Sequence, residues 1–298
     1  MTARQVLPLA ICLAAAGPAL CQTLVHITRD QSVMLRKPDG SAVRIASRGS
    51  GPALSPDGRQ VAFVRSYDDP ASGSALCLWT APAGPLRTLL KAKARIHGLS
   101  WSPAGGQLMY VVSEFSGRTR IHLGLPGRSA PEISPAALGA SGCYEPVWDP
   151  GGKSIFFHDM QNLFQVGSDG KLIQRTPLET ITGRRDAVTS ADRFVPSPGD
   201  PDVIAYTMEA PGSSLFIKRV HEPPSALFLY RIRGRTRTRL TPQTMTAISP
   251  TWSRDGRTLL FTGYTDRQAA EPYPMRVYSI AQDAPSPSEL CRGEDAAW

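Results

Sequence analysis

Residues 98–113 read GLSWSPAGGQLMYVVS, and residues 249–264 read SPTWSRDGRTLLFTGY. In both stretches a tryptophan precedes a short turn containing glycine, and an apolar run follows the turn. The same pattern recurs in three further places, GPALSPDGRQVAFVRS (51–66), EPVWDPGGKSIFFHD (145–159) and FVPSPGDPDVIAYTME (194–209). The tryptophan position, which we term the Trp column, is occupied by Leu54, Trp101, Trp148, Pro196 and Trp252, at spacings of 47, 47, 48 and 56 residues. Self-similarity at such a period indicates a repeat architecture.

Each repeat predicts four antiparallel strands. A short strand ends at the Trp column, and a turn of the Ser-Pro-Asp-Gly type follows, in which proline presets φ and glycine accepts a positive φ. The apolar runs that come next predict strands buried on both faces, at Val61–Val64, Leu108–Val112, Ile155–Phe157, Val203–Tyr206 and Leu259–Phe261. A second hairpin completes each unit, at residues 76–89, 121–133, 163–175, 227–240 and 276–290. Four strands per repeat are typical of a β-propeller blade.

The two ends of the chain predict one more blade. Residues 24–46 contain a strand and a hairpin without a Trp-column strand, and the sequence reaches Trp298 46 residues after Trp252. We therefore expect residues 293–298 to form the innermost strand of the blade whose other strands lie in residues 24–46. This pairing would close the ring and remove free sheet edges. The predicted fold is an all-β, six-bladed β-propeller of four-stranded blades over residues 22–298, with an open solenoid or a β-sandwich as the alternative.

Composition agrees with a β protein rich in turns. The 298 residues include 26 glycines and 27 prolines, and 41% of the chain is hydrophobic, which suffices for a core and disfavours a helical bundle. The net charge of +8 favours contact with anionic partners. No apolar run beyond the N-terminus is long enough to span a membrane. We expect a monomer that binds no nucleic acid.

Residues 1–21, MTARQVLPLAICLAAAGPALC, have the pattern of a secretory signal peptide. Arg4 precedes a short apolar region, and the small residues Ala19 and Cys21 stand at the −3 and −1 positions of a cleavage site after Cys21. We therefore expect a periplasmic or secreted protein. Leu20 occupies a position where a lipoprotein signal has a small residue, so lipidation of Cys21 is the less favoured alternative.

The sequence contains no recognisable catalytic, nucleotide or metal motif. It has neither G-x-S-x-G nor H-E-x-x-H. Gly151-Gly152-Lys153-Ser154 ends like a phosphate loop, but Val147 replaces the first glycine and a strand follows. Cys77, Cys143 and Cys291 match no zinc spacing, and buried thiols are favoured over a disulfide. We expect no cofactor, no metal and no enzymatic activity.

Candidate binding residues stand three or four residues before the Trp column. Residues that enter the innermost strands of a propeller ring one mouth of its central channel. The candidates are His97, Tyr144, Glu145, Arg193 and Glu294, the last beside Asp295. Such a mixed-charge cluster can bind a ligand or perform acid–base chemistry, and the alternative is a solvated rim with incidental charges.

A second candidate surface is a run of alternating arginines in the longest repeat. It consists of Arg231, Arg233, Arg235, Arg237 and Arg239. On a single strand they would share one face, but Gly234 predicts a turn that divides them between two outer strands. They would either dock an anionic surface or protect an exposed blade edge by charge.

The repeated Trp-Ser-Pro-Asp-Gly units resemble the WD-repeat-like blades of the TolB propeller family. The resemblance covers five turn motifs and essentially all of residues 22–298. It implies a binding protein of the bacterial periplasm or cell envelope. About two residues separate the expected signal peptide from the first strand, so the chain departs from TolB in lacking the α/β domain that precedes that propeller, and the partners of TolB do not transfer directly.

We therefore expect a non-catalytic binding module or scaffold whose partner is an envelope or secreted protein, with an anionic partner favoured. Similar blades also occur beside prolyl-oligopeptidase-type catalytic domains and in oligogalacturonide lyases. The alternative is accordingly a lyase or hydrolase of an acidic oligosaccharide, with His97 as acid or base and Arg193 neutralising a substrate carboxylate. A structural propeller within a larger envelope complex is a third possibility.

Overall fold

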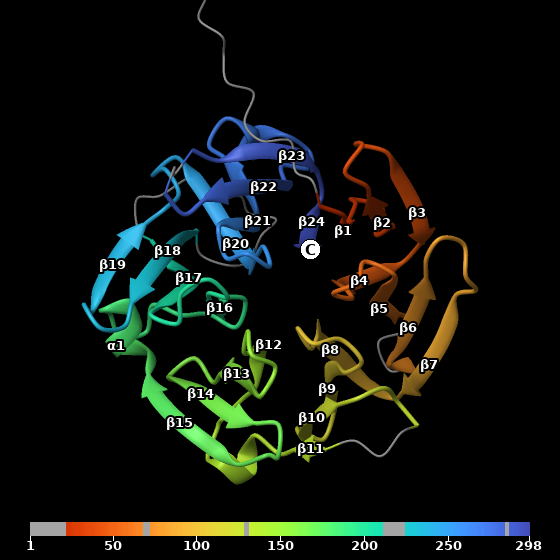
Figure 1. Ribbon diagram of the computed structural model, residues 1–298, viewed down its shortest axis with the longest axis horizontal. Helices are drawn as coiled ribbons and strands as arrows, with labels where there is room; N and C mark the ends of the chain where they lie inside the picture. Colours follow the sequence, from red (N-terminus) through yellow and green to blue (C-terminus); the bar gives the residue numbers. More distant parts are fainter. Residues whose placement is uncertain (1–21, 68–71, 128–130, 211–223, 284–285) are drawn as a thin grey trace, which may run out of the picture.

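Six antiparallel sheets are arranged in a ring around a central axis in the computed structural model (Figure 1). The structure describes residues 22–298 except 68–71, 128–130, 211–223 and 284–285. The expected signal peptide, residues 1–21, lies outside the described residues. Each sheet has four strands, so the predicted six-bladed propeller is confirmed.

Within each blade the strands follow one another from the channel outward. Blade 1 consists of β24 (Glu294–Ala297), β1 (Leu24–Ile27), β2 (Val33–Arg36) and β3 (Ala42–Ala46). Blade 2 consists of β4 (Gly49–Leu54), β5 (Gln60–Ser66), β6 (Ser74–Thr80) and β7 (Arg87–Ala92). Blade 3 consists of β8 (Ala94–Trp101), β9 (Leu108–Glu114), β10 (Thr119–Leu123) and β11 (Glu132–Ile133).

The second half of the ring has the same order. Blade 4 consists of β12 (Tyr144–Trp148), β13 (Ser154–His158), β14 (Asn162–Gly167) and β15 (Leu172–Pro177). Blade 5 consists of β16 (Phe194–Pro196), β17 (Val203–Glu209), β18 (Ser225–Arg231) and β19 (Thr236–Arg239). Blade 6 consists of β20 (Met245–Trp252), β21 (Thr258–Thr265), β22 (Arg276–Ala281) and β23 (Ser288–Arg292). Helix α1 (Leu178–Thr182) joins blades 4 and 5, and short 3-10 turns lie at Ala136–Leu138 and Gln268–Ala270.

The two ends of the chain meet in blade 1, as the sequence predicts. Strand β24 pairs antiparallel with β1, with Val25 opposite Ala297 and Ile27 opposite Glu294. The last strand therefore takes the innermost place in a sheet that the first strands began. This pairing closes the ring and covers the inner edge of β1.

The hydrophobic core lies in layers between neighbouring blades. The layer between blades 3 and 4, for example, includes Ile121, Ile155, Phe157 and Phe164, none more than 1% exposed. Phe157 and Phe164 stack with ring centroids 5.0 Å apart. Each such side chain contributes about 1.5–3 kcal/mol of burial free energy, so each blade is stabilised mainly by its neighbours.

The tryptophans of the Trp column link the inner strands of neighbouring blades. The Nε1–H groups of Trp101, Trp148 and Trp252 donate to the backbone oxygens of Ala53, Ser100 and Val195, at 3.2, 3.1 and 3.0 Å. Every acceptor is the residue just before the Trp column of the preceding blade. This repeated bond explains why the sequence repeats a tryptophan at this place.

The turns after the Trp column are built as the sequence predicts. In the first, Asp57 accepts hydrogen bonds from the Ser55 hydroxyl at 2.5 Å and the Arg59 backbone N–H at 3.0 Å, and Gly58 adopts a φ of +70°. These bonds, led by that from Ser55, lower the pKa of Asp57. The Asp57 carboxylate therefore stabilises the turn.

The three cysteines of the described residues are unpaired, and the prediction that all three are buried holds for Cys77 and Cys143 but not for the partly buried Cys291. Cys77, Cys143 and Cys291 are free, and the first two are buried in the layers between blades. Among the residues that the structure describes, no helix is long and apolar enough to cross a membrane.

Candidate functional site

The inner strands carry a repeated irregularity three residues before the Trp column. The pairing of β4, β8, β12 and β20 with the next strand shifts register around this position. The six equivalent residues, which we term the channel ring, are Gly51, Gly98, Glu145, Arg193, Ser249 and Asp295. All except Arg193 adopt a positive φ, between +43° and +61°. Non-glycine residues rarely adopt this conformation, so the backbone at Glu145, Ser249 and Asp295 is strained, by about 1–3 kcal/mol each.

The channel ring surrounds a cavity of about 900 Å³ that follows the axis of the propeller. Among its lining residues are five of the six ring members, the exception being Ser249. The ring is asymmetric because blades 2 and 3 contribute glycines, whereas blades 4, 5 and 1 contribute charged side chains. A Cβ on Gly51 would meet no atom within 4 Å, so this side of the cavity is open.

The two ends of the cavity differ in chemistry. At the end where the inner strands finish, the Trp-column mouth, the lining consists of Trp101, Trp148, Trp252, Trp298 and residues of the following turns. At the opposite end the lining includes Tyr67, Arg95 and Phe115. The six steps along the strand from Arg95 to Trp101 in β8 place the two ends about 20 Å apart.

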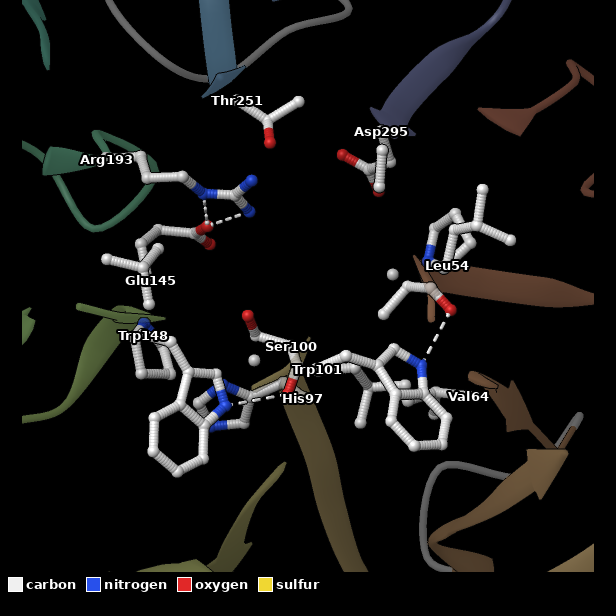
Figure 2. A pocket seen from close by; sticks show the side chains of 18 of the residues that line it. Leu54, Val64, His97, Ser100, Trp101, Glu145, Trp148, Arg193, Thr251 and Asp295 are labelled. Carbon is white, nitrogen blue, oxygen red and sulfur yellow. Dashed lines mark hydrogen bonds and ion pairs between the residues drawn. The ribbon is translucent and has the colours of Figure 1, made fainter. Parts of the chain in front are cut away.

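Arg193 and Glu145 form an ion pair across neighbouring blades. The Arg193 Nε–H donates to Glu145 Oε2 at 2.8 Å, and Nη2 donates to the same oxygen. The side chains are 26% and 28% exposed. Burial opposes the charge of Arg193, but the attraction of Glu145 outweighs it and raises the pKa of the guanidinium. Figure 2 shows this pair projecting into the cavity and Asp295 facing it from another blade.

Asp295 is the second carboxylate of the ring. Burial raises its pKa, with Arg193 acting in the opposite direction. Ser249 Oγ lies 3.5 Å from Asp295 Oδ1, and the backbone N–H of Asp295 donates to Thr262 Oγ1 at 2.9 Å. The ring thus presents one arginine and two carboxylates, all partly buried.

His97 lines the cavity but is engaged by its own blade. Its Nε2 lies 3.1 Å from Ser113 Oγ, which in turn lies 3.1 Å from Thr119 Oγ1. Burial, assisted by Arg95, lowers the pKa of His97 to about 4, so the imidazole is neutral at pH 7. It is a weak base with one nitrogen already occupied.

Tyr144 and Glu294 are not among the described residues that line the cavity. The Tyr144 ring packs against His158, with centroids 5.7 Å apart, and Glu294 lies opposite Ile27 in β1. His97 occupies the same position in its own repeat, one residue before the channel ring, but of the three only His97 lines the cavity. Of the predicted cluster, the structure therefore brings Glu145 and Arg193 into contact, with His97 along the same cavity.

Sequence reasoning placed Asp295 beside the predicted cluster but chose its neighbour Glu294 as the candidate, and it missed the role of the two glycines. The alignment of the repeats on the Trp column contains the information that identifies the channel ring. Taking the third residue before the Trp column in every repeat selects the whole channel ring, whereas mixing two adjacent positions selected Tyr144 and Glu294.

The alternating arginines are divided by a turn at Gly234, as predicted, with β18 ending at Arg231 and β19 spanning Thr236–Arg239. Arg231 and Arg233 lie 3.4 and 3.9 Å from Asp200 and Asp202.

The other members of the set are also held locally. Arg237 donates to the Ile181 oxygen at 2.5 Å and lies over the Tyr230 ring, whereas Arg239 donates to the Thr241 oxygen at 2.8 Å. Arg235 belongs to the turn, with a φ of +48°. Most arginines of this set are therefore engaged in contacts that stabilise blade 5 and its surroundings.

Within the described part of the chain, no group of three or more His, Cys, Asp or Glu side chains could hold a metal ion.

Known structures agree with the fold. TolB from Acinetobacter baumannii is similar with a TM-score of 0.66 at 18% identity, covering 93% of this chain and 66% of that one. The chain thus spans just under two thirds of that TolB. A TolB-type protein from Agrobacterium tumefaciens gives a TM-score of 0.59 at 15% identity, with 92% and 90% covered. The β-propeller domain of the trilobed protease from Pyrococcus furiosus gives 0.51 at 14%, with 91% and 79% covered.

No protein-family model and no curated protein matches the sequence. The TolB likeness that the repeats predict is confirmed as a likeness of fold. Because one of these propellers is a domain of a protease, the fold alone does not decide between binding and catalysis, and function has to be argued from the cavity.

Proposed function

We propose that the protein is an exported β-propeller binding module that takes a protein partner at the Trp-column mouth of its cavity, in the periplasm or cell envelope. The observation that carries the proposal is the axial cavity of about 900 Å³. It combines aromatic and aliphatic walls with a few fixed polar groups, which is the usual construction of a binding site.

The rigidity of the wall supports this function. Trp101, Trp148 and Trp252 are each hydrogen-bonded to the preceding blade, and Arg193 is held by Glu145. A wall fixed before binding loses little conformational entropy when a partner docks. The turns at the mouth can vary in sequence without disturbing the blade core.

The competing function is an enzyme acting on an acidic oligosaccharide. It needs His97 as acid or base and Arg193 as the counter-ion of a substrate carboxylate. His97 is bonded to Ser113 and has a pKa lowered to about 4, and Arg193 is paired with Glu145. Both groups are engaged within the protein, which favours the binding module.

The proposal is tested by co-purification followed by affinity measurement. An affinity tag belongs in the exposed Asp39–Gly40 turn, because Trp298 lines the cavity and must stay free. A protein captured from the envelope of the native host is then purified, and its Kd is measured for the wild type and the double variant E145Q/R193Q. We expect at least about tenfold weaker binding by the double variant.

A matched control comes from an ion pair on the outer part of blade 3. Arg120 Nε lies 2.8 Å from Glu132 Oε1, away from the cavity lining. The variant R120Q/E132Q removes the same two charges and should bind like the wild type. Equal affinity of both double variants for the partner would contradict the assignment of the cavity as the site.

A further inference from the structure

The turns that follow the Trp column form a collar around the mouth. In blade 6, a Cβ on Gly256 would lie 2.4 Å from the backbone nitrogen of Gly199 in the turn of blade 5. In blade 4, a Cβ on Gly152 would lie 3.2 Å from Ser102 Oγ in the turn of blade 3. At these two places a turn therefore packs closely on the turn of the preceding blade, and equivalent turn positions line the mouth.

The second residue after the Trp column lines the cavity in all five continuous repeats. These residues are Pro56, Pro103, Pro150, Pro198 and Arg254. Four prolines beside the tryptophans make the collar apolar. Arg254 is the exception, and it stands in the turn that packs on the turn of Pro198.

The charge of Arg254 is not compensated by its own turn. Asp255 accepts hydrogen bonds from Ser253 Oγ at 2.6 Å and from the Arg257 backbone at 3.1 Å, so its carboxylate is used in the turn. The Arg254 side chain is exposed and makes no hydrogen bond or ion pair with the residues that the structure describes. By contrast, Arg193 deeper in the cavity is already bound to Glu145.

We propose that the Trp-column mouth recognises a partner segment in which a carboxylate stands next to an apolar side chain, and that Arg254 binds this carboxylate. The inference rests on the proposed function and names the chemistry of its partner. The apolar side chain packs on the prolines and tryptophan edges, which excludes water around the charge pair. A guanidinium in such surroundings binds a carboxylate with a specific fork geometry.

Arg95 provides the comparison that separates a local contact from general attraction. It also lines the cavity, but at the opposite end of β8, about 20 Å from Trp101. Because 20 Å exceeds the Debye length of about 8 Å at physiological salt, a change of charge at Arg95 should leave binding at the mouth unchanged, although it alters the charge of the same cavity.

The test uses a phage-displayed library of random 12-residue peptides selected on the intact protein. Selected peptides are synthesised with each Asp or Glu and with its Asn or Gln counterpart, and their Kd values are measured by fluorescence polarisation. R254P restores the residue found in the other repeats, so it should fold normally. P103R is expected to fold as well, because arginine already occupies the equivalent place in blade 6.

We expect the wild type to bind the carboxylate form about tenfold more tightly than the amide form. R254P should lose this preference, R95E should keep it, and P103R should strengthen binding of the carboxylate form. A carboxylate preference that survives in R254P would overturn the inference.

The bulky variant P150W distinguishes failure of the Arg254 inference from failure of the proposed function. Suppose that P150W blocks binding of a peptide and that R254P leaves the carboxylate preference of the same peptide unchanged. The mouth is then the binding site, and only the role of Arg254 is contradicted. If P150W blocks none of the selected peptides, the mouth is not the binding site and both proposals fall.

Discussion

Glu145 and Arg193 come from neighbouring blades and hold each other in the channel ring. Each is about one quarter exposed, so neither is solvated well enough to tolerate loss of the other at no cost. We predict that E145Q and R193Q each destabilise the protein, and that the double variant is destabilised by less than the sum. Chemical denaturation should give a coupling free energy of about 1–2 kcal/mol. Strict additivity would show that the pair adds nothing to stability.

Glu294 makes stability depend on pH. Burial, assisted by Asp295, raises its pKa from 4.5 to about 7. The folded state therefore holds a proton that the unfolded state releases, and the resulting stabilisation is complete below pH 4.5 and lost as the pH rises through 7. E294Q, which stays neutral, should unfold like the wild type near pH 4.5 but be more stable by about 1–3 kcal/mol at pH 8.

Thermal and denaturant unfolding of wild type and E294Q at both pH values measures this difference. Asp295 stands beside Glu294 and also has a pKa raised by burial, so the comparison is between variants at each pH and not between pH values of one protein. The exposed Glu114 supplies the control variant E114Q. A stability gain from E294Q that is the same at both pH values would contradict the assigned cause.

At the level of the strand, the tryptophans of the Trp column differ in whether the indole N–H donates a hydrogen bond to the preceding blade. Trp148 donates to the Ser100 oxygen, whereas the buried Nε1 of Trp298 has no acceptor among the described residues. Loss of a buried hydrogen bond costs about 1 kcal/mol, while removal of an unsatisfied donor costs nothing comparable. We predict that W148F lowers the free energy of unfolding by about 1–2 kcal/mol more than W298F. Equal losses measured by denaturation would argue against the interblade bond.

The strands and turns could be predicted because each requires particular residue types at neighbouring positions in the sequence. The turns need Pro, Asp and Gly, the Trp column needs an indole donor, and the second strand of each blade needs a short apolar run. The bulge before the Trp column has no comparably clear sequence pattern. It nevertheless decides which of two adjacent residues faces the channel. Tyr144 and Glu145 could therefore not be separated without the backbone.

The contacts of the basic run depend on tertiary structure. Arg231 meets Asp200, and Arg237 meets Ile181, at separations of 31 and 56 residues along the chain. Nothing in the alternation of arginines indicates these partners. The sequence correctly divides the run at Gly234 but cannot show how much of its charge is already used.

At the scale of the molecule, the ring depends on the pairing of its two ends. We predict that deletion of residues 293–298 uncovers the inner edge of β1, where Val25 and Ile27 are buried, and destabilises the protein by at least about 3 kcal/mol. A circular permutant that joins Trp298 to the start of β1 through a Ser-Pro-Asp-Gly turn and opens the Asp39–Gly40 turn keeps every inner pairing. Its melting temperature should stay near that of the wild type, and a permutant as unstable as the deletion would refute closure by β24.

Docking of a protein partner at the Trp-column mouth can be tested by site-specific photo-crosslinking in the intact envelope. A photoreactive amino acid is placed at Pro198 in the collar, and separately at Lys171, which is exposed beside the outer strand of blade 4. We predict one reproducible crosslinked protein from position 198 and none from position 171. The same partner crosslinking from position 171 but not from position 198 would contradict it.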